Sequence, residues 1–194
     1  TSATTGITTR TKQSSYYEGS YTANGRIAYL AFNSIIYEIT GEINGFHVAN
    51  NTYNSSGFAN NTYFPGYNGE WIAVDLGVSI ILKQVRFFPR GGRDPGLFRI
   101  YGTNDVSQFN GPSYNNWTVI YEQTVRLTLS ANYTSGQPTI VNINNNNPYQ
   151  IYALVVNQLS SDGGLLLNFL EWELYGKEVT LTTPPILPIQ YSGG

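Results

Sequence analysis

The stretch Glu70–Asp105, EWIAVDLGVSIILKQVRFFPRGGRDPGLFRIYGTND, carries the clearest structural signals in the chain. Within residues 71–76, the aliphatic Ile72, Val74 and Leu76 alternate with the other three residues, as the two faces of a β-strand do, and Gly77 ends the run. A second β-rich run covers Ile80–Phe88, and a loop rich in glycine and proline follows it. Leu97–Tyr101 has the composition of a third strand. The stretch therefore predicts consecutive β-strands joined by tight connections.

Several pieces of the chain share a pattern with one known family. They are WIAVDLG at 71–77, the strand that ends in VRFF, FRIYGTND at 98–105 and the later Trp117. Two further segments follow in the same order, PYQIYALVVN at 148–157 and FLEWELYG at 169–176. Together they resemble the discoidin family, meaning the coagulation-factor C-type domains and related galactose-binding-like carbohydrate modules. The resemblance covers roughly residues 40–176, and it implies a β-sandwich of jelly-roll type with ligand loops at one end.

We therefore expect an all-β protein, an antiparallel jelly-roll β-sandwich with an extra N-terminal hairpin and extended tails. The sandwich should occupy residues 26–176, with the hairpin at 26–40, where an amphipathic helix is the alternative. Residues 1–25 are expected to form an extended N-terminal arm, and residues 177–194 a C-terminal strand and proline-rich arm. The residues predicted to contribute to the core are Trp71, Val74, Leu76, Val85, Ile100, Ile151, Leu154, Val156, Trp172 and Leu174.

Composition narrows the class of protein. Charged residues make up 11% of the chain, well below the roughly 25% of typical soluble domains, so the surface is polar without being strongly charged. The net charge of −2 argues against a nucleic-acid partner, which favours basic surfaces. No apolar run approaches the ~20 residues of a membrane helix, and we expect no membrane insertion. The chain has no cysteine, which excludes disulfides and is neutral on compartment for a domain of this size. It has no methionine either, not even at position 1, so we expect a processed product or an excised fragment. Removal of a signal peptide is one natural cause, and we expect a protein that is secreted or at the cell surface.

Five N-x-[S/T] sequons support the same location. Three of them cluster in one loop-like stretch between residues 50 and 62, where attached glycans would have room. If the chain passes through a eukaryotic secretory route, we expect sugar on some of these positions. The candidate glycosylation sites are Asn50, Asn54, Asn60, Asn116 and Asn132.

The sequence gives little support to an enzyme. His47 is the only histidine, and no G-x-S-x-G elbow, H-E-x-x-H or Walker-type motif is present. Nothing in the spacing of the carboxylates selects a pair for glycoside hydrolysis. The PRGGRDPG segment lacks the Lys-Ser/Thr and the following helix of a phosphate loop, so it is read as a turn between strands. We predict a non-catalytic protein.

A ligand site is expected in two regions. The long loop region 42–69 is rich in aromatic residues, and the resemblance implies that it carries a binding loop. Its aromatic side chains either contact a ligand or cover the end of the sandwich. The two arginines of the PRGGRDPG turn could bind a ligand through paired hydrogen bonds. The candidate ligand-binding residues are His47, Tyr53, Tyr63, Tyr67, Arg90 and Arg93.

The resemblance also implies a calcium site in many relatives. Here Asn44 stands where an Asp-Gly pair is expected, and Glu173 stands where the family has a glutamate. Losing one carboxylate weakens a site for a hard cation. The sequence therefore leaves Ca²⁺ as a candidate ligand but requires no cofactor. Glu171 departs from the basic residue of coagulation-type members, which puts their lipid-binding arrangement in doubt.

Two functions from different classes fit these observations. The first is an extracellular structural subunit that assembles with other copies of itself into a homopolymer or fibre by exchanging a tail or strand. The second is a lectin-like module that binds glycans or mediates adhesion. The tails could instead fold back along their own domain. The residues of the predicted assembly arm are Val179, Leu181, Ile186, Leu187, Ile189 and Tyr191.

Overall fold

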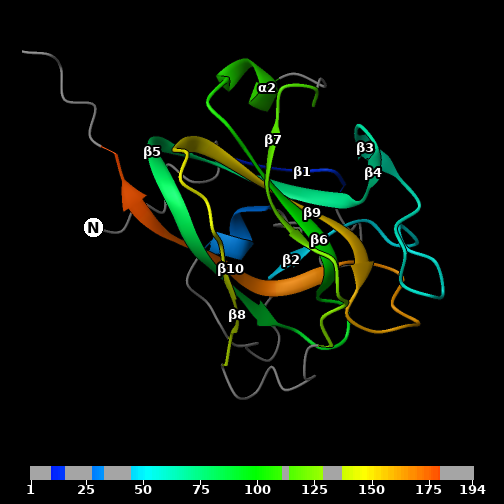
Figure 1. Ribbon diagram of the computed structural model, residues 1–194. Coiled ribbons are helices and arrows are strands. Elements are labelled where there is room, and N and C mark those ends of the chain that lie inside the picture. The colour runs from blue at the N-terminus through cyan, green and yellow to red at the C-terminus, as the bar shows by residue number, and fades with distance from the viewer. Residues whose placement is uncertain (1–9, 16–27, 33–44, 111–113, 129–136, 180–194) are drawn as a thin grey trace, which may run out of the picture.

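The computed structural model describes residues 10–15, 28–32, 45–110, 114–128 and 137–179 (Figure 1). The strands in this part of the chain are β1 (Thr11–Gln13), β2 (Phe46–His47), β3 (Thr62–Phe64), β4 (Tyr67–Asn68), β5 (Glu70–Pro89), β6 (Pro95–Thr103), β7 (Thr118–Gln123), β8 (Thr139–Asn142), β9 (Tyr149–Leu159) and β10 (Asn168–Glu178). Two short helices accompany them, the 3-10 helix η2 (Ala28–Phe32) and the α-helix α2 (Val106–Asn110). Among the described residues, no helix has the length and apolar character needed to cross a membrane. The predicted all-β class is confirmed.

Strand β5 belongs to both layers of a β-sandwich. Its first part pairs with β1 and β9, and its last part pairs with β8 and β10. One layer therefore contains β1, β5, β9, β6 and β7, and the other contains β2, β10, β5 and β8. All of these pairings are antiparallel, as predicted.

The bend of β5 lies where the sequence predicted a stop. Gly77 has a φ of 73°, in the left-handed region that favours glycine, and its N–H donates to Asp75 Oδ1 at 2.8 Å. The pairing of β5 with β9 skips a few residues between Asp75 and Ile80 and then resumes. The glycine thus redirects the chain without ending the strand. The prediction of two separate strands was wrong in this respect.

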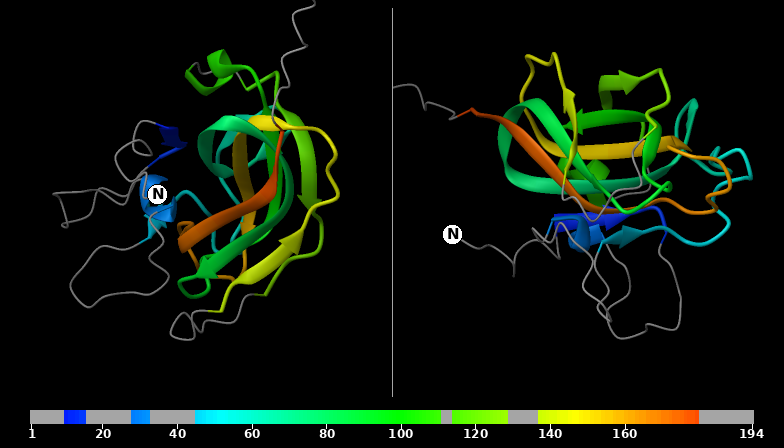
Figure 2. Two further views of the ribbon diagram at one scale, coloured as in Figure 1. Left: turned by 90° about the vertical axis from the view of Figure 1, so that its left-hand side faces the viewer. Right: turned by 90° about the horizontal axis from the view of Figure 1, so that it is seen from below.

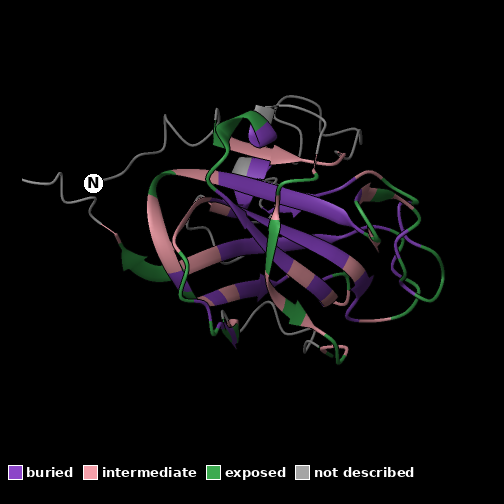
Figure 3. Cartoon of the chain, turned by 45° about the horizontal axis from the view of Figure 1, so that its top comes forward, coloured by how far each residue is buried: buried purple, intermediate pink, exposed green. Residues whose placement is uncertain are grey.

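The main core lies between the two layers (Figure 3). Large side chains from both layers meet there, and the rings of Phe87 and Phe98 are 5.3 Å apart in an edge-to-face arrangement. Each fully buried large apolar side chain stabilises the fold by about 1.5–3 kcal/mol. Of the predicted core residues, Leu76 and Leu174 are only partly buried and pack against this core. The others are buried, although Trp71 and Ile151 face the opposite side of their layer.

That opposite side carries a second apolar cluster, which we call the outer cluster. Strand β9 alternates between the two, so Ile151, Ala153 and Val155 point into the outer cluster and their neighbours into the main core. Phe64 of β3 and Phe109 of α2 cover the outer cluster from above. β9 is therefore buried on both faces, which explains its nearly continuous apolar sequence.

The predicted N-terminal hairpin is wrong at residues 28–32, which form η2 instead of a strand. The start of β10, at Asn168 and Phe169, is paired with β2. The helix packs its small residues against the sandwich, with Ala31 fully buried, and places the Phe32 ring 5.6 Å from that of Trp172. The other residues of the predicted hairpin lie outside the described part of the chain.

Part of the predicted N-terminal arm is docked on its own domain. β1 pairs with residues 72–74 of β5, and β1 and η2 lie next to each other (Figure 2). Two following serines donate to the buried Glu70 carboxylate, Ser15 at 2.7 Å, and Asn61 Nδ2 donates to it at 2.7 Å. These hydrogen bonds satisfy a carboxylate that would otherwise be costly to bury.

The C-terminal segment also begins by pairing with its own domain. Val179 N–H donates to Ser79 O at 3.0 Å, which continues the pairing of β10 with β5. The other residues of the predicted assembly arm, Leu181, Ile186, Leu187, Ile189 and Tyr191, lie outside the described residues. Their role in assembly stays a prediction.

Candidate functional site

Three loops meet at one end of the sandwich, which we call the loop end. They cover residues 48–61, 90–94 and 160–167, and the last of them lies between the other two (Figure 1). Four hydrogen bonds join them: Val48 N to Leu167 O at 3.1 Å, Tyr53 N to Leu165 O at 3.2 Å, Gly163 N to Ser55 O at 2.8 Å and Ser160 N to Asp94 O at 2.8 Å. The loops therefore form one connected surface.

The 90–94 turn is tight because two adjacent glycines have positive φ. Gly91 has a φ of 118° and Gly92 one of 75°, so other residues would be strained there. A Cβ on Gly92 would lie 2.8 Å from Ser161 Oγ, which leaves no room for a side chain. The glycines thus let the turn pack closely against the 160–167 loop.

Asp94 holds this turn from the inside. Its carboxylate accepts hydrogen bonds from Arg90 N at 2.7 Å and Gly91 N at 3.3 Å, and the side chain is fully buried. Burial raises the pKa of Asp94 to about 6, although the backbone hydrogen bonds act in the opposite direction. The position of the turn, and of the arginines on it, depends on this residue.

Three polar side chains come together beside the turn. The Arg90 guanidinium contacts His47 Nε2, and because a guanidinium can only donate, that ring nitrogen must be an acceptor. His47 pairs across β2 and β10 with Asn168, so the two side chains lie on the same side of the sheet. Arg90 follows Pro89, which pairs with the neighbouring Phe169. The ends of three adjacent strands therefore supply His47, Asn168 and Arg90.

This group retains hydrogen-bonding capacity. Asn168 is 4% exposed, and its Oδ1 has no hydrogen-bond partner among the described residues. Arg90 is half-buried, whereas Arg93 on the same turn is exposed. Phe58 and Leu165 are each 41% exposed on the neighbouring loops. The loop end thus combines guanidinium donors, a carboxamide acceptor and exposed apolar surface.

The predicted ligand residues separate into two groups. His47 and Arg90 are in contact at the loop end, and Arg93 lies on the same turn as Arg90; their role as ligand-binding residues stays a prediction. Tyr53 is a core residue instead, since it is 1% exposed and its hydroxyl donates to Val156 O at 2.8 Å. Burial raises the pKa of Tyr53 well above its ordinary value. The prediction that Tyr53 contacts a ligand is wrong, because the hydroxyl is enclosed.

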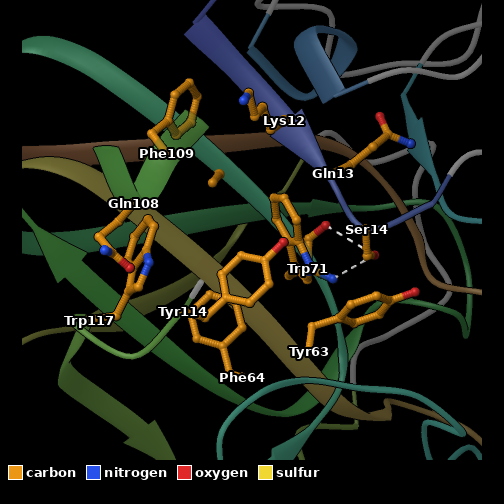
Figure 4. Close-up of a pocket in the computed structure, with 11 residues that line it drawn as sticks. Lys12, Gln13, Ser14, Tyr63, Phe64, Trp71, Gln108, Phe109, Tyr114 and Trp117 are labelled. Atoms are coloured by element: carbon orange, nitrogen blue, oxygen red, sulfur yellow. Dashed lines mark hydrogen bonds between the residues drawn. The ribbon is translucent and has the colours of Figure 1, made fainter. Parts of the chain in front are cut away.

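Tyr63 and Tyr67 lie on the outer face of the sandwich rather than at the loop end. Tyr67 is half-buried and its ring lies under the Arg99 guanidinium, 4.2 Å from the ring centre. Tyr63 lines a cleft of about 280 Å³ over the outer cluster (Figure 4). The cleft is bounded by β1, β3, β5, α2 and the segment 114–117. Sequence reasoning missed this cleft and missed Asn168.

The surroundings of Glu173 do not fit a calcium ion. Its carboxylate accepts a hydrogen bond from Tyr175 at 2.7 Å and lies 3.9 Å from the Arg86 guanidinium. Within the described ranges, no three His, Cys, Asp or Glu side chains are grouped as a metal site would require. Asn44, the other predicted ligand, lies outside the described residues.

The described sequon asparagines are accessible. Asn50, Asn54, Asn60 and Asn116 are exposed, while Asn132 lies outside the described residues. Asn54 Oδ1 accepts hydrogen bonds from two backbone N–H groups of its own loop, both at 3.0 Å. Exposure is compatible with glycosylation at these positions, which stays a prediction.

Comparisons with known proteins bear on the fold. No protein-family model matches the chain, and no curated protein matches it significantly by sequence. Solved structures do match. A carbohydrate-binding module of a family 89 glycoside hydrolase from Clostridium perfringens, solved with GalNAc-β-1,3-galactose, is 14% identical with a TM-score of 0.55, covering 86% of this chain and 94% of that one. Chitosan-binding module 1 of a Paenibacillus chitosanase/glucanase is 18% identical with a TM-score of 0.52, covering 86% and 93%.

A third match is the F-lectin from striped bass (Morone saxatilis) serum, 17% identical with a TM-score of 0.53, covering 87% of this chain and 45% of that one. The chain has the galactose-binding-like fold. This agrees with the fold that the discoidin-like sequence pattern implies. Further matches include a family 89 glycoside hydrolase from Clostridium perfringens, of which the match covers 14% of the chain.

Proposed function

We propose that this chain is a non-catalytic, extracellular carbohydrate-binding domain whose site is the loop end. The observation that carries the proposal is the meeting of His47, Asn168 and Arg90 at the ends of three adjacent strands. His47 and Asn168 are on strands, and the turn that carries Arg90 is held by the buried Asp94. Such support positions the side chains more firmly than a loop alone, which suits recognition of a ligand with fixed stereochemistry.

The chemistry of this group suits a sugar. A guanidinium presents several N–H donors in a fixed plane and can bind two neighbouring hydroxyl oxygens at once. The buried Asn168 Oδ1 supplies an acceptor for a hydroxyl hydrogen. His47 contacts Arg90 from below and orients it. The exposed ring of Phe58 on the neighbouring loop offers a surface for the C–H face of a pyranose.

The carboxylates at the loop end are engaged in other interactions. Asp94 is buried and accepts backbone hydrogen bonds, and Asp162 forms an ion pair with Arg126 at 2.7 Å. Neither is placed as one member of an acid and base pair. The comparison with a module solved together with GalNAc-β-1,3-galactose supports the same class of ligand.

The proposal is tested by binding measurements on matched variants. We would screen the protein on a glycan array and then titrate it with GalNAc-β-1,3-galactose and with the best array ligand. Arg90→Ala should weaken binding about 10- to 100-fold, the range expected for losing hydrogen bonds from a charged group. Arg86→Ala is the control, because Arg86 lies on the sheet beside Glu173 and Tyr175. Absence of glycan binding by the unaltered protein, or equal losses in both variants, would contradict the proposal.

The self-assembling fibre subunit, our first expectation from the tails, is favoured less than the carbohydrate-binding alternative. In the described part of the chain, β1 and Val179 pair with β5 of their own domain. A fibre subunit could still carry a sugar-binding domain, so we retain assembly as a separate prediction with its own test below.

A further inference from the structure

The cleft over the outer cluster has features of a second binding site. It shares no lining residue with the loop end, and it lies on the outer face of the layer that contains β1, β5 and β9 (Figure 4). Its volume of about 280 Å³ suits a small ring rather than an extended chain. Half-buried side chains such as Tyr63, Tyr114 and Trp117 form its accessible part.

The walls of the cleft are a connected set of aromatic rings. Phe64 lies at their centre, with the ring centres of Tyr101 and Tyr114 at 4.6 Å and 4.7 Å and that of Trp117 at 5.6 Å. Trp71 completes the set, 5.6 Å from Tyr114 in an edge-to-face arrangement. Mutually packed rings hold one another in place, so the cleft is largely preformed.

Three buried polar atoms of the lining residues have no hydrogen-bond partner in the described structure. Two are donors, the Nε1 atoms of Trp71 and Trp117, and one is an acceptor, Gln108 Oε1. Trp71 is 7% exposed and Gln108 9% exposed. Gln13 is not counted with them, because its amide points away from the cleft and donates to His47 O (Figure 4). Native structures pair nearly all such groups. Three in one cleft indicate that a ligand supplies the missing partners.

The arrangement restricts the chemistry of that ligand. A purely apolar molecule would leave the donors and acceptors unsatisfied. Among the described residues that line the cleft there is no carboxylate to meet a cation, and the one charged side chain is that of Lys12, whose Nζ lies 5.0 Å from the Phe109 ring centre. The ligand must offer a face of C–H bonds to the rings and hydroxyl groups that both donate and accept. A neutral pyranose ring meets these requirements.

We propose that the outer cleft is a second carbohydrate site that holds one neutral pyranose ring, separate from the loop end. The sugar packs its C–H face on the aromatic walls. Its hydroxyl oxygens accept from the indole N–H groups of Trp71 and Trp117, and one of its hydroxyl groups donates to Gln108 Oε1. This site does not depend on the proposed function of the loop end.

The tryptophans allow a direct test. The chain has three, of which Trp71 and Trp117 line the cleft and Trp172 is fully buried in the main core. We would titrate ¹⁵N-labelled protein with methyl β-galactopyranoside, methyl β-glucopyranoside and methyl N-acetyl-β-glucosaminide. The indole N–H signals of Trp71 and Trp117 should shift in a saturable way with at least one sugar, while that of Trp172 stays in place.

Variants show whether those groups bind the sugar. Trp117→Phe keeps a ring but removes the donor, and Gln108→Ala removes an acceptor; each should weaken binding at the cleft about 2- to 10-fold. Tyr175→Phe, which removes a hydroxyl from an exposed aromatic residue on β10, should change nothing. If no sugar shifts the Trp71 and Trp117 signals, or if Trp172 shifts with them, the cleft proposal is overturned. Shifts confined to the amides of Gly91 and Gly92 would overturn it while leaving the loop-end proposal intact.

Discussion

At the scale of single residues, Asp94 has a structural role at the loop end. Its carboxylate is buried under the turn that presents Arg90 and Arg93, where it accepts backbone hydrogen bonds. A group of this kind titrates differently in the folded and unfolded chain. The pH dependence of stability therefore reports on the turn itself.

Burial raises the pKa of Asp94 from 3.8 to about 6. The folded state therefore holds this proton more tightly than the unfolded state. The resulting stabilisation is fully present below about pH 4 and is lost as pH rises through about 6. It amounts to about 3 kcal/mol at most. Asp94→Asn should remove this contribution, so the difference in unfolding free energy between the two proteins, measured with urea at about pH 4 and about pH 8, should change with pH. A constant difference would show that Asp94 is not linked to folding.

Tyr53 gives a second prediction at this scale. Tyr53→Phe removes the buried hydroxyl that donates to Val156 O while leaving the ring in the core. We expect a loss of about 1 kcal/mol in the free energy of unfolding. Glycan affinity should stay unchanged, because the hydroxyl is enclosed. Weaker glycan binding with unchanged stability would restore the ligand role that the sequence predicted for this residue.

At the scale of elements, short β2 depends on Gly45, which precedes it. Gly45 has a φ of 87°, and a Cβ there would lie 2.6 Å from Phe169 O on β10. Gly163 has a similar φ of 77° but open space around it. Gly163→Ala should therefore cost only the backbone strain, about 1 kcal/mol. Gly45→Ala should cost about 1–3 kcal/mol more and should weaken glycan binding, because β2 carries His47. Thermal and urea unfolding would compare them; equal losses would refute the contact argument.

The elements also show how far sequence reasoning reaches. Alternation and β-branched content predicted the central strands, because these signals are local. The bend at Gly77 was predicted as the end of a strand. A glycine in the sequence indicates an unusual backbone conformation, but it does not show whether strand pairing continues beyond it. The apolar run at residues 28–32 was predicted as part of a hairpin, with a helix as the alternative, and it forms η2, which packs against β10. Pattern alone does not separate strand from helix in so short an apolar run.

The sites were predicted unevenly for a related reason. His47 could be found because it lies in the long loop region 42–69, and Arg90 because it lies on the PRGGRDPG turn directly after a family-like strand. Asn168 had only one weak signal, its position just before the closing strand. The outer cleft had none, since its lining comes from five separate segments that only the folded chain brings together.

For the whole molecule, the open question is assembly, and the prediction concerns the segment after β10. Deleting residues 179–194 should abolish any homopolymer while the sandwich stays folded, if an arm from one copy docks on another. Size-exclusion chromatography and negative-stain imaging would measure assembly, and circular dichroism would check the fold. A matched deletion of residues 1–9 leaves β1 in place. Normal assembly by both truncated proteins would contradict the hypothesis that an arm from one copy docks on another.

The bend of β5 described above also holds both ends of the described domain. Arg10 donates to Leu76 O, and Val179 N–H donates to Ser79 O, three residues further along the same strand. A pulling force applied through the two ends would thus load adjacent points. It would peel β1 and β10 away from β5 one hydrogen bond at a time instead of shearing the sandwich as a unit. Under load, the domain is expected to unfold by successive breaking of strand pairs. Because its described ends lie close together, it could also be inserted into a surface loop of another protein with little added linker.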